Sequence, residues 1–398
     1  MLASINKCSG CMACLNICPE DCISSEIDEE GFYQPIIDEQ RCIKCGKCTA
    51  SCPVLHDTVK KANDTPIVYA AWNKDEDVLK ISSSGGVFGV FAKHILENGG
   101  VVFGAAYNED LSVKHIVAYS LDDLKHLHGS KYVQSEIGEI FRCVKSALDK
   151  NRYVLFTGTP CQVAGLYGFL GQDNFENLFT CDLVCHGVPS PGVFKSYINY
   201  LDNRENKRLK SIKMRTKRRG WNSVFDMEYV FDNDKEIELK NAFKDPYMNG
   251  FLYDLYLRKS CYDCQYAKTT RESDITIADF WGIGNDKPFN HPTKQGVSLV
   301  LLNSNKGQEL FQQCSENMYF EERSLAEAQK GNVMLSPRQH SNPNREKFFE
   351  EYNTKSFEEL IHKYLRRRQS LKSSLIKVVI KILGRKNIKR IKWMIAKV

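Results

Sequence analysis

Two runs of cysteine near the start of the chain constrain its fold more than any other feature. The first, CSGCMACLNICP, spans Cys8 to Pro19, and the second, CIKCGKCTASCP, spans Cys42 to Pro53. In each run two residues separate the first three cysteines, three residues precede the fourth, and a proline follows it. A tight loop can bring three thiolates to three irons of a cubane cluster, and the fourth cysteine of such a run serves the other cluster. The spacing therefore predicts two 4Fe–4S clusters with crossed ligands.

The crossing predicts which cysteines share a cluster. The two expected sets are Cys8, Cys11, Cys14 and Cys52 for one cluster, and Cys42, Cys45, Cys48 and Cys18 for the other. The crossing ties both runs into one unit, which matters because about 55 residues bury little core without a staple. Zinc knuckles are the alternative, but zinc sites use two C-x2-C pairs or mixtures of Cys and His. This stretch resembles the bacterial two-cluster ferredoxins, and Cys22, which fits neither run, is expected to be a packed thiol.

The sequence between the two runs predicts a short hairpin. ISSEIDEEGFYQPIID alternates in character around a Glu-Gly turn, which is typical of two strands joined by a tight connection.

The composition favours a reducing compartment. The chain has 398 residues, of which sixteen are cysteine, and a small secreted protein would use so many for disulfides. No apolar leader precedes Cys8, and no run reaches the roughly 18 apolar residues of a membrane span. We therefore expect a cytoplasmic protein whose thiols stay reduced and bind metal.

The basic residues are concentrated in the last part of the chain. The net charge is +6, but twelve Lys and Arg and no Asp or Glu lie between Leu365 and Val398. The rest of the chain carries 43 basic and 49 acidic residues, a net charge of −6. Apolar residues recur at helical spacing in this tail, which predicts a basic amphipathic segment in peripheral contact with the anionic inner face of a membrane. Docking on an acidic partner or on the protein's own body are the alternatives.

After a polar stretch at 57–66, strand-like and helix-like segments alternate. The apolar runs typical of buried strands are 67–72, 99–107 and 153–156. SSSGG (82–86) and GTPCQ (158–162) each open a helical pattern. Glycines and hydroxyls at a helix N-terminus suit a phosphate, although an ordinary capped helix has the same composition. Two strand–turn–helix units predict an α/β sheet with a ligand at the carboxyl ends of its strands.

A second group of cysteines is distributed over this part of the chain. It comprises Cys161, Cys181, Cys185, Cys261 and Cys264. Four thiolates from separate loops can hold another cluster or a zinc ion, and the alternative is that they are core residues, as free cysteines often are. Cys143 and Cys314 lie in helical sequence without a motif, and we expect both in the core.

Five short motifs, taken in order, resemble the family of the coenzyme F-420 hydrogenase beta subunit. They are SSSGG (82–86), GSKYVQS (129–135), GTPCQ (158–162), CHG (185–187) and CYDC followed by SDITIADFWG (261–282). This family also includes F-420-dependent dehydrogenase subunits and hydroxymethyl-chlorophyll reductase. The resemblance covers about residues 67–302, with the ferredoxin-like stretch in front of it.

The resemblance implies an α/β domain in which a third 4Fe–4S cluster lies beside an FAD. The implied cluster ligands are Cys161, Cys185, Cys261 and Cys264, with Cys181 competing for the place of Cys185. The implied FAD contacts are Ser83, Ser84, Gly85, Gly86, Gly129, Ser130, Lys131, Tyr132, Thr157, Gly158, Thr159 and Gln162. Clusters pass single electrons whereas a flavin can exchange a hydride, so the resemblance implies an iron–sulfur flavoprotein oxidoreductase.

The substrate and the partner stay open at this point. The hydride would pass to or from a small donor or acceptor, either an F-420-like deazaflavin or another compound. Ferredoxin-fused bacterial proteins of this kind often occur near surface-polysaccharide genes, which is a loose association. The alternative is an electron-transfer subunit, or adaptor, that has no substrate of its own and works with a redox partner protein.

No acid–base pair stands out, so the catalytic residues are unassigned. For His186 a loop histidine bonded to the backbone is favoured over a proton carrier, and for Asp279 a turn or helix cap is favoured. Lys131 either neutralises a flavin phosphate or reduced flavin, or is solvated. The basic stretch 204–220 is expected to form a solvated edge strand and shows no nucleic-acid motif.

These patterns together predict a mixed fold of the α+β and α/β classes. The expected layout is a two-cluster ferredoxin domain at 1–57, an FAD- and cluster-binding domain at 67–335, a helical connector at 336–364 and the basic tail at 365–398.

Overall fold

The computed structural model describes residues 2–56, 65–171, 175–221, 226–232, 237–337 and 342–365. The predicted linker at 57–66 and the predicted basic tail at 365–398 lie outside these ranges, apart from 65–66 and Leu365. No helix among the described residues combines the length and the apolar character that crossing a membrane requires.

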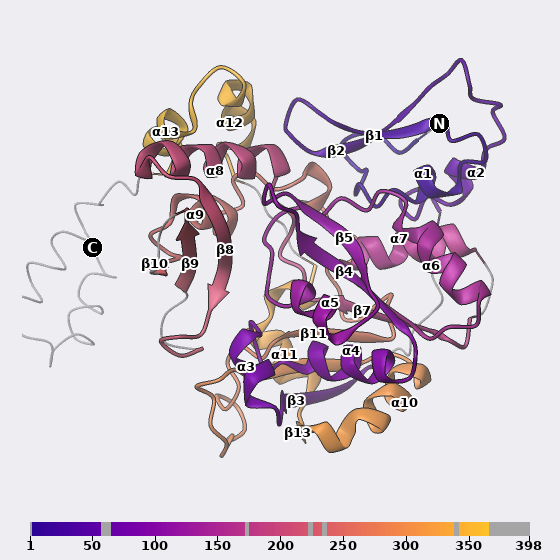
Figure 1. Ribbon diagram of the computed structural model, residues 1–398, viewed down its shortest axis with the longest axis vertical. Coiled ribbons are helices and arrows are strands. Elements are labelled where there is room, and N and C mark those ends of the chain that lie inside the picture. Colours follow the sequence, from indigo (N-terminus) through magenta and orange to yellow (C-terminus); the bar gives the residue numbers. More distant parts are fainter. Residues whose placement is uncertain are drawn as a thin grey trace, which may run out of the picture.

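The first 56 residues form a small unit at one end of the molecule (Figure 1). It contains helix α1 (Ala13–Ile17), strands β1 (Ile23–Ile27) and β2 (Tyr33–Ile37), and helix α2 (Lys47–Ala50). β1 and β2 pair antiparallel, and Gly31 (φ 79°) allows the turn between them, which confirms the predicted hairpin. Each short helix follows a residue in the left-handed region, Met12 (φ 60°) or Gly46 (φ 76°), so both cysteine runs fold into tight loops.

An eight-stranded mixed sheet forms the centre of the rest of the chain. Its strands, in spatial order, are β13 (Met318–Glu322), β3 (Ile67–Asn73), β12 (Ser298–Leu302), β11 (Ile275–Asp279), β7 (Leu178–Leu183), β6 (Val154–Gly158), β4 (Val101–Tyr107) and β5 (Val113–Ala118). The four neighbours β11, β7, β6 and β4 run parallel. Their carboxyl ends therefore meet at one edge of the sheet, as the strand–turn–helix pattern predicts.

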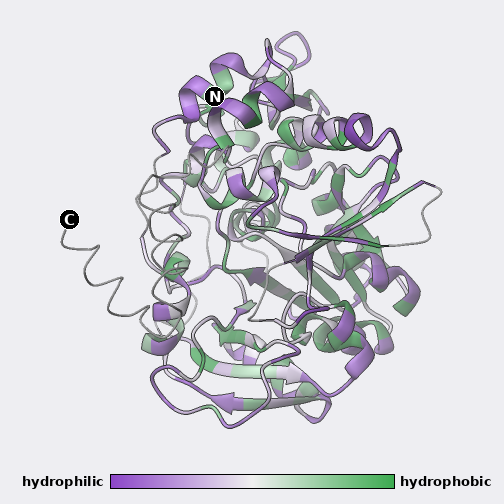
Figure 2. Ribbon diagram, turned by 90° about the vertical axis from the view of Figure 1, so that its left-hand side faces the viewer, coloured by the Kyte–Doolittle hydropathy of each residue, from purple (hydrophilic) through white to green (hydrophobic). Residues whose placement is uncertain are grey.

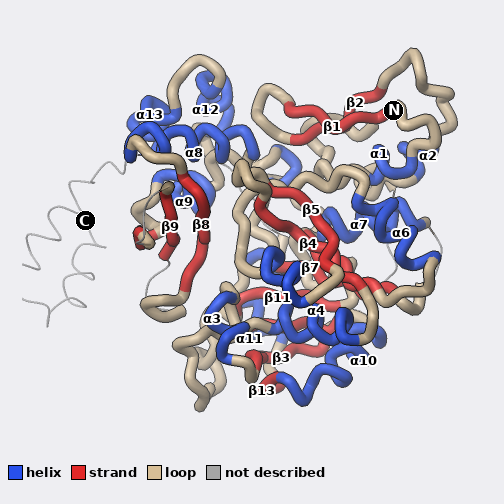
Figure 3. Tube along the Cα trace, viewed as in Figure 1, coloured by secondary structure: helices blue, strands red, loops and turns tan. Residues whose placement is uncertain are grey.

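Helices cover both faces of this sheet (Figure 3). On one face α4 (Val87–Glu97) and α10 (Asn305–Cys314) share a core with alternate strand residues such as Val102 and Leu155. On the other face α6 (Ile140–Asp149) and α7 (Pro160–Leu170) pack on Val101 and Val154, together with α1 of the N-terminal unit. Hydrophobic residues accordingly concentrate on the inner strands (Figure 2). The shorter helices of this part are α3 (Glu76–Ile81), α5 (Leu121–Leu124) and α11 (Leu325–Gly331).

A second, smaller sheet lies beside the large one. Its order is β10 (Glu238–Asn241), β9 (Asp226–Phe231) and β8 (Leu209–Thr216), all antiparallel. The helices α8 (Pro191–Glu205), α9 (Pro246–Leu252), α12 (Arg345–Tyr352) and α13 (Phe357–Leu360) contribute to its core. β8 is an edge strand, as predicted.

The two cysteines predicted to lie in the core differ in their exposure to solvent. Cys314, on α10, is buried. Cys143, on α6, is exposed, so that prediction was wrong. The amphipathic α6 turns Phe141, Val144 and Leu148 toward the sheet, and Cys143 falls on the opposite side of the helix.

Candidate iron–sulfur and flavin site

Four cysteines from the two N-terminal runs lie together: Cys8, Cys11, Cys14 and Cys52. Burial raises the pKa of Cys11 to about 12, and the nearby thiols of Cys8 and Cys52 add to the rise. Burial and the neighbouring thiols also raise the pKa of Cys14. The structure thus brings together the four cysteines that the crossed spacing predicts for one cluster.

The other predicted set lies nearer the surface. Cys18 is buried and Cys42 and Cys48 are half-buried, but Cys45 is exposed. Cys22 is buried, as predicted, and its sulfur lies 3.3 Å from that of Cys18. The hydrogen bond with Cys18, then burial and the thiol of Cys42, raise the pKa of Cys22 to about 12. Cys22 therefore contacts two of the predicted ligands, which the spacing alone did not indicate.

A third set forms at the carboxyl edge of the large sheet. Its members are Cys161 in the first turn of α7, Cys185 after β7, and Cys261 and Cys264 in the loop before β11. Burial and the other three thiols raise the pKa of Cys185 well above its usual range. Backbone N–H groups donate to two of the sulfurs, from Gly187 to Cys185 (3.4 Å) and from Val188 to Cys261 (3.5 Å). Such bonds are among the factors that tune a bound cluster.

Cys181 lies apart from this third set. It is 2% exposed within the core between the sheet and α4, and the charges nearest to its thiol are those of Asp182 and Asp274. The structure therefore groups Cys185, and not its competitor Cys181, with the other three cysteines.

The sets are groups of neighbouring thiols. No three His, Cys, Asp or Glu side chains in the described part of the chain converge tightly enough to hold a single metal ion. A 4Fe–4S cluster binds its four thiolates on four different irons, and each predicted set offers four cysteines.

Helix α7 contacts both the first set and the third. A Cβ atom on Gly165 would lie 2.7 Å from the Cβ of Cys11, so the loop just before α1 lies directly against α7 there. The thiols of Cys11 and Cys161 are close enough that negative charge on Cys161 raises the pKa of Cys11. Cys161 and Gly165 are four residues apart on α7 and share a face of the helix, so the first and third sets approach each other along about one helical turn.

Arg258 lies in the same region, and no motif marks it in the sequence. Its side chain is 1% exposed and donates from Nε to the carbonyl of Cys8 (2.7 Å) and from Nη1 to the carbonyl of Tyr33 (2.9 Å). Its positive charge opposes the burial that raises the pKa of Cys161 and Cys261. Arg258 thus joins the N-terminal unit to the rest of the chain, close to two of the cysteine sets.

Two of the predicted flavin-binding motifs meet directly. The backbone N–H of Ser130 donates to Ser83 Oγ (2.8 Å), and the two hydroxyls lie 2.9 Å apart. Gly129 has a φ of 82° with open space around it, so this loop needs glycine for its backbone alone. Gly85, by contrast, has no room for a side chain, because its Cβ would lie 2.5 Å from the carbonyl oxygen of Ala71.

The side chains of the third motif are bonded within the protein. Thr157 donates to the carbonyl of Phe103 (2.8 Å). Thr159 and Gln162 form a capping box at the start of α7, and Gln162 Nε2 also donates to Ser135 Oγ (3.0 Å). Ser135 belongs to the GSKYVQS segment, which therefore connects SSSGG with GTPCQ. The Thr159 and Gln162 side chains therefore cap the helix, as in the alternative to a phosphate site.

Two half-buried lysines at this site donate to backbone carbonyls. Lys131 Nζ donates to the carbonyls of 126, 127 and 128 at 2.9–3.1 Å, and burial lowers the pKa of Lys131 to about 7. Lys217 Nζ donates to the carbonyls of Ser84 and Gln295, both at 2.5 Å, and burial, with the charge of Arg215, lowers its pKa to about 8. Lys131 is thus held by three backbone carbonyls of its own loop.

The basic stretch and Asp279 meet in a way that corrects two predictions. Arg215 on β8 is 8% exposed and forms an ion pair with Asp279 at the end of β11, so the strand is not solvated throughout. Asp279 also accepts from Trp221 Nε1 (2.6 Å), and it is not a helix cap. The rings of Trp221 and Trp281 stack at 5.1 Å, and Arg215 lies 4.8 Å above the Trp281 ring.

His186 has a carboxylate neighbour that the sequence does not indicate. Its Nε2 lies 2.8 Å from the Asp254 carboxylate. Its ring meets Phe251 edge-on at 4.8 Å, and Phe251 in turn packs at 5.0 Å on Tyr132. This aromatic contact joins the third cysteine set to the GSKYVQS segment.

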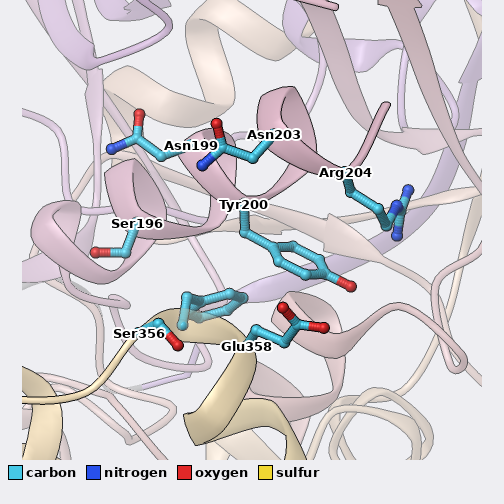
Figure 4. A pocket seen from close by; sticks show the side chains of 8 residues that line it. Ser196, Asn199, Tyr200, Asn203, Arg204, Ser356 and Glu358 are labelled. Carbon is cyan, nitrogen blue, oxygen red and sulfur yellow. The ribbon is translucent and has the colours of Figure 1, made fainter. Parts of the chain in front are cut away.

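A separate pocket of about 560 Å³ lies between α8 and α13. Its lining residues are Ser196, Asn199, Tyr200, Asn203, Arg204, Ser356, Phe357 and Glu358 (Figure 4). None of the predicted site residues is among them, so this pocket is distinct from the cysteine sets and the Ser/Gly motifs.

Comparisons with known protein families first identify the general class of protein to which this chain belongs. Models of 4Fe–4S dicluster domains match residues 7–55 and 34–82. With the paired cysteine runs described above, these matches define an iron–sulfur protein with a redox role.

The chain belongs to the family of the coenzyme F420 hydrogenase/dehydrogenase beta subunits. The model of the family's N-terminal part matches residues 68–142, and the model of its C-terminal part matches residues 151–328. The mixed sheet and the third cysteine set lie within these ranges, so the resemblance inferred from the five motifs is confirmed.

The relatives found include redox proteins of methanogens. The chain is 25% identical over 307 residues to a coenzyme F420-dependent sulfite reductase of Methanocaldococcus jannaschii, which covers 76% of this chain and 45% of that protein. It is 24% identical over 165 residues to one of the F(420)H(2) dehydrogenase subunits of Methanosarcina mazei, covering 39% and 46%. The chain thus spans about half the length of the curated relatives it matches. A chain of the F420-reducing [NiFe] hydrogenase complex from Methanosarcina barkeri aligns with a TM-score of 0.46 and 18% identity, over 77% of this chain and 94% of that chain.

Proposed function

We propose that the chain is an iron–sulfur flavoprotein oxidoreductase that relays electrons through three 4Fe–4S clusters to FAD, which exchanges hydride with a small compound. The observation that carries this proposal is the succession of three cysteine sets, the last of which adjoins the Ser/Gly motifs. Cys161 belongs both to the third set and to GTPCQ, so a cluster and a flavin held by these residues would be neighbours.

The proposed cluster ligands are the three predicted sets. The thiols of Cys8, Cys11, Cys14 and Cys52 influence one another's pKa, as do those of Cys161, Cys185, Cys261 and Cys264, and this proximity supports two of the sets. The raised pKa values mean that the buried thiols hold their protons strongly without metal, and iron would have to displace those protons. When bound, the clusters supply single-electron transfer and the flavin supplies hydride chemistry.

The flavin would be held by the SSSGG, GSKYVQS and GTPCQ segments. Lys131 and Lys217 support this proposal, because each is half-buried and donates to carbonyl oxygens, and among the described residues neither forms an ion pair. A nearby anion stabilises the charged form of a lysine in that setting, and the diphosphate of FAD would provide such an anion. Both lysines would hold the cofactor by charge and neutralise negative charge near it.

The test is cofactor analysis of the full-length protein purified without oxygen. We expect one FAD and about twelve irons with matching sulfide per chain, as three cubane clusters require. About eight irons without FAD would contradict the flavoenzyme and leave an electron carrier. Reduced protein is then offered deazaflavin, nicotinamide, quinone-like and nucleotide-sugar acceptors, the last because of the association with surface-polysaccharide genes.

An electron-transfer subunit without its own substrate is the second candidate. It is favoured by relatives named as a dehydrogenase subunit and as part of a hydrogenase complex. Turnover of a small acceptor by the isolated chain supports the first function. Flavin reduction that requires an added partner polypeptide supports the second.

A further inference from the structure

The two cluster sites of the N-terminal unit differ in their access to solvent. Cys11 and Cys14 are buried, with Cys11 against α7, whereas Cys45 is exposed and Cys42 and Cys48 are half-buried. Electron transfer through protein slows steeply with distance. An external protein would therefore exchange electrons fastest with a cluster at the outer set, which is also the set farther along the relay from the flavin motifs.

The loop that carries the outer cysteines has a distinct surface. Arg41, Lys44 and Lys47 are exposed on it, and Ile43 is 60% exposed beside Cys42. No Asp or Glu occurs from 41 to 56. Among the described residues Lys44 and Lys47 form no ion pair. This basic loop, defined as residues 41–47, contrasts with the net charge of −6 of the chain without its tail.

Acidic residues next to the basic loop limit the extent of its positively charged surface. The exposed Asp38 and Glu39 come just before the loop, and Arg41 is held by its bond to the carbonyl of Glu20 (2.7 Å). The left-handed backbone of Lys44 (φ 56°) and Gly46 (φ 76°) folds the loop tightly around Cys45. The two lysines therefore flank the exposed cysteine, with an apolar side chain next to them.

We propose that the basic loop is the docking surface for a small one-electron carrier protein with an acidic face. This inference rests on the proposed function, since it needs a cluster at the outer set. Complementary charges raise the encounter rate and orient partners, and Ile43 offers an apolar contact at the centre. A transient redox contact of this kind buries little area, which suits a short loop.

The experiment measures how fast a carrier reduces the full-length protein with its cofactors. The probe is a reduced acidic two-cluster ferredoxin, followed by stopped-flow absorbance at several salt concentrations. The double variant Lys44→Glu/Lys47→Glu is compared with Lys210→Glu/Lys244→Glu, which changes the net charge equally at exposed positions on β8 and in the turn after β10. We expect the second-order rate constant to fall about tenfold or more at low salt in the first variant only. At about 1 M salt, where charges are screened within about 3 Å, the difference should vanish.

A small reductant separates the two ways in which this test can fail. A zwitterionic viologen of zero net charge needs no docking surface and should reduce both variants at the parental rate. If it reduces no cluster in the parent protein, the proposed function itself fails. If it works but the ferredoxin rate is independent of salt and of Lys44 and Lys47, the docking proposal is overturned, and a permanent subunit over this loop becomes the better account.

Discussion

The affinity of the protein for FAD should depend on pH through Lys131. The pKa of this lysine is lowered to about 7 by burial, so in the flavin-free protein it loses its proton as the pH rises past neutrality. An anionic diphosphate restores the proton, because it favours the charged form. FAD binding is thus coupled to proton uptake above pH 7, and the dissociation constant should rise about tenfold per pH unit there.

Lys217 adds a second step to this pH dependence. Its pKa is lowered to about 8, so its proton also has to be restored above that pH. From pH 7 to pH 9 we expect a loss of about 50-fold in affinity from Lys131, which is already half deprotonated at pH 7, and about 10-fold from Lys217. The total, about 500-fold, corresponds to about 3.7 kcal/mol of binding free energy, and it is an upper limit because it assumes that both lysines stay protonated in the complex.

The assay is titration of FAD into flavin-depleted protein without oxygen, followed by flavin fluorescence between pH 6 and pH 9. Lys131→Arg keeps a positive charge at every pH used, so its affinity should fall much less than that of the parent. Lys131→Met should bind FAD weakly even at pH 6. The reasoning is refuted if the parent affinity is constant over this range, or if the Lys131→Arg profile follows the parent.

Three further predictions concern the iron sites and the core. Cys185→Ser should lose about four of twelve irons while Cys181→Ser keeps them all, by iron and sulfide analysis. Arg258→Gln removes a buried positive charge near two cysteine sets, which costs the reduced clusters about 1–2 kcal/mol of Coulomb energy. We therefore expect the reduction potentials of the clusters to fall by about 50–90 mV in a redox titration followed by electron paramagnetic resonance. Unchanged potentials would contradict that role. Arg271 pairs with Asp182 at 3.0 Å with both side chains buried, so Arg271→Met should cost about 3–5 kcal/mol in denaturant unfolding.

The parts of the fold that the sequence predicts well depend on short-range spacing. The hairpin at β1 and β2, the strands β3, β4 and β6 and the start of α7 all follow from local periodicity and turn residues. The tight loops of the two cysteine runs also follow from local sequence, with Met12 and Gly46 in the left-handed region. In each case the residues that determine the feature lie within a few positions of one another.

The errors arise where a distant segment decides the environment. Arg215 shares the alternating register of the exposed Lys213 on an edge strand, so the pattern indicates solvent. Its carboxylate partner, Asp279, is 64 residues away and becomes its neighbour only because the small sheet packs beside the large one. Cys143 and Cys314 look alike in sequence, and only the face that each helix presents to the sheet separates them.

The proposed relay from the N-terminal unit to the third cysteine set would depend on such a distant contact. Spacing keeps the two ferredoxin-like sets together, but it says nothing of how closely that unit approaches the family domain. That approach rests on Gly165, where even a Cβ would lie 2.7 Å from Cys11, and on Arg258, which bonds to the carbonyls of Cys8 and Tyr33. Neither residue has a signature of its own, yet together they determine how far apart the first and third sets lie. Because electron transfer slows steeply with distance, these two unmarked positions bear on the rate of the relay as directly as the cysteines do.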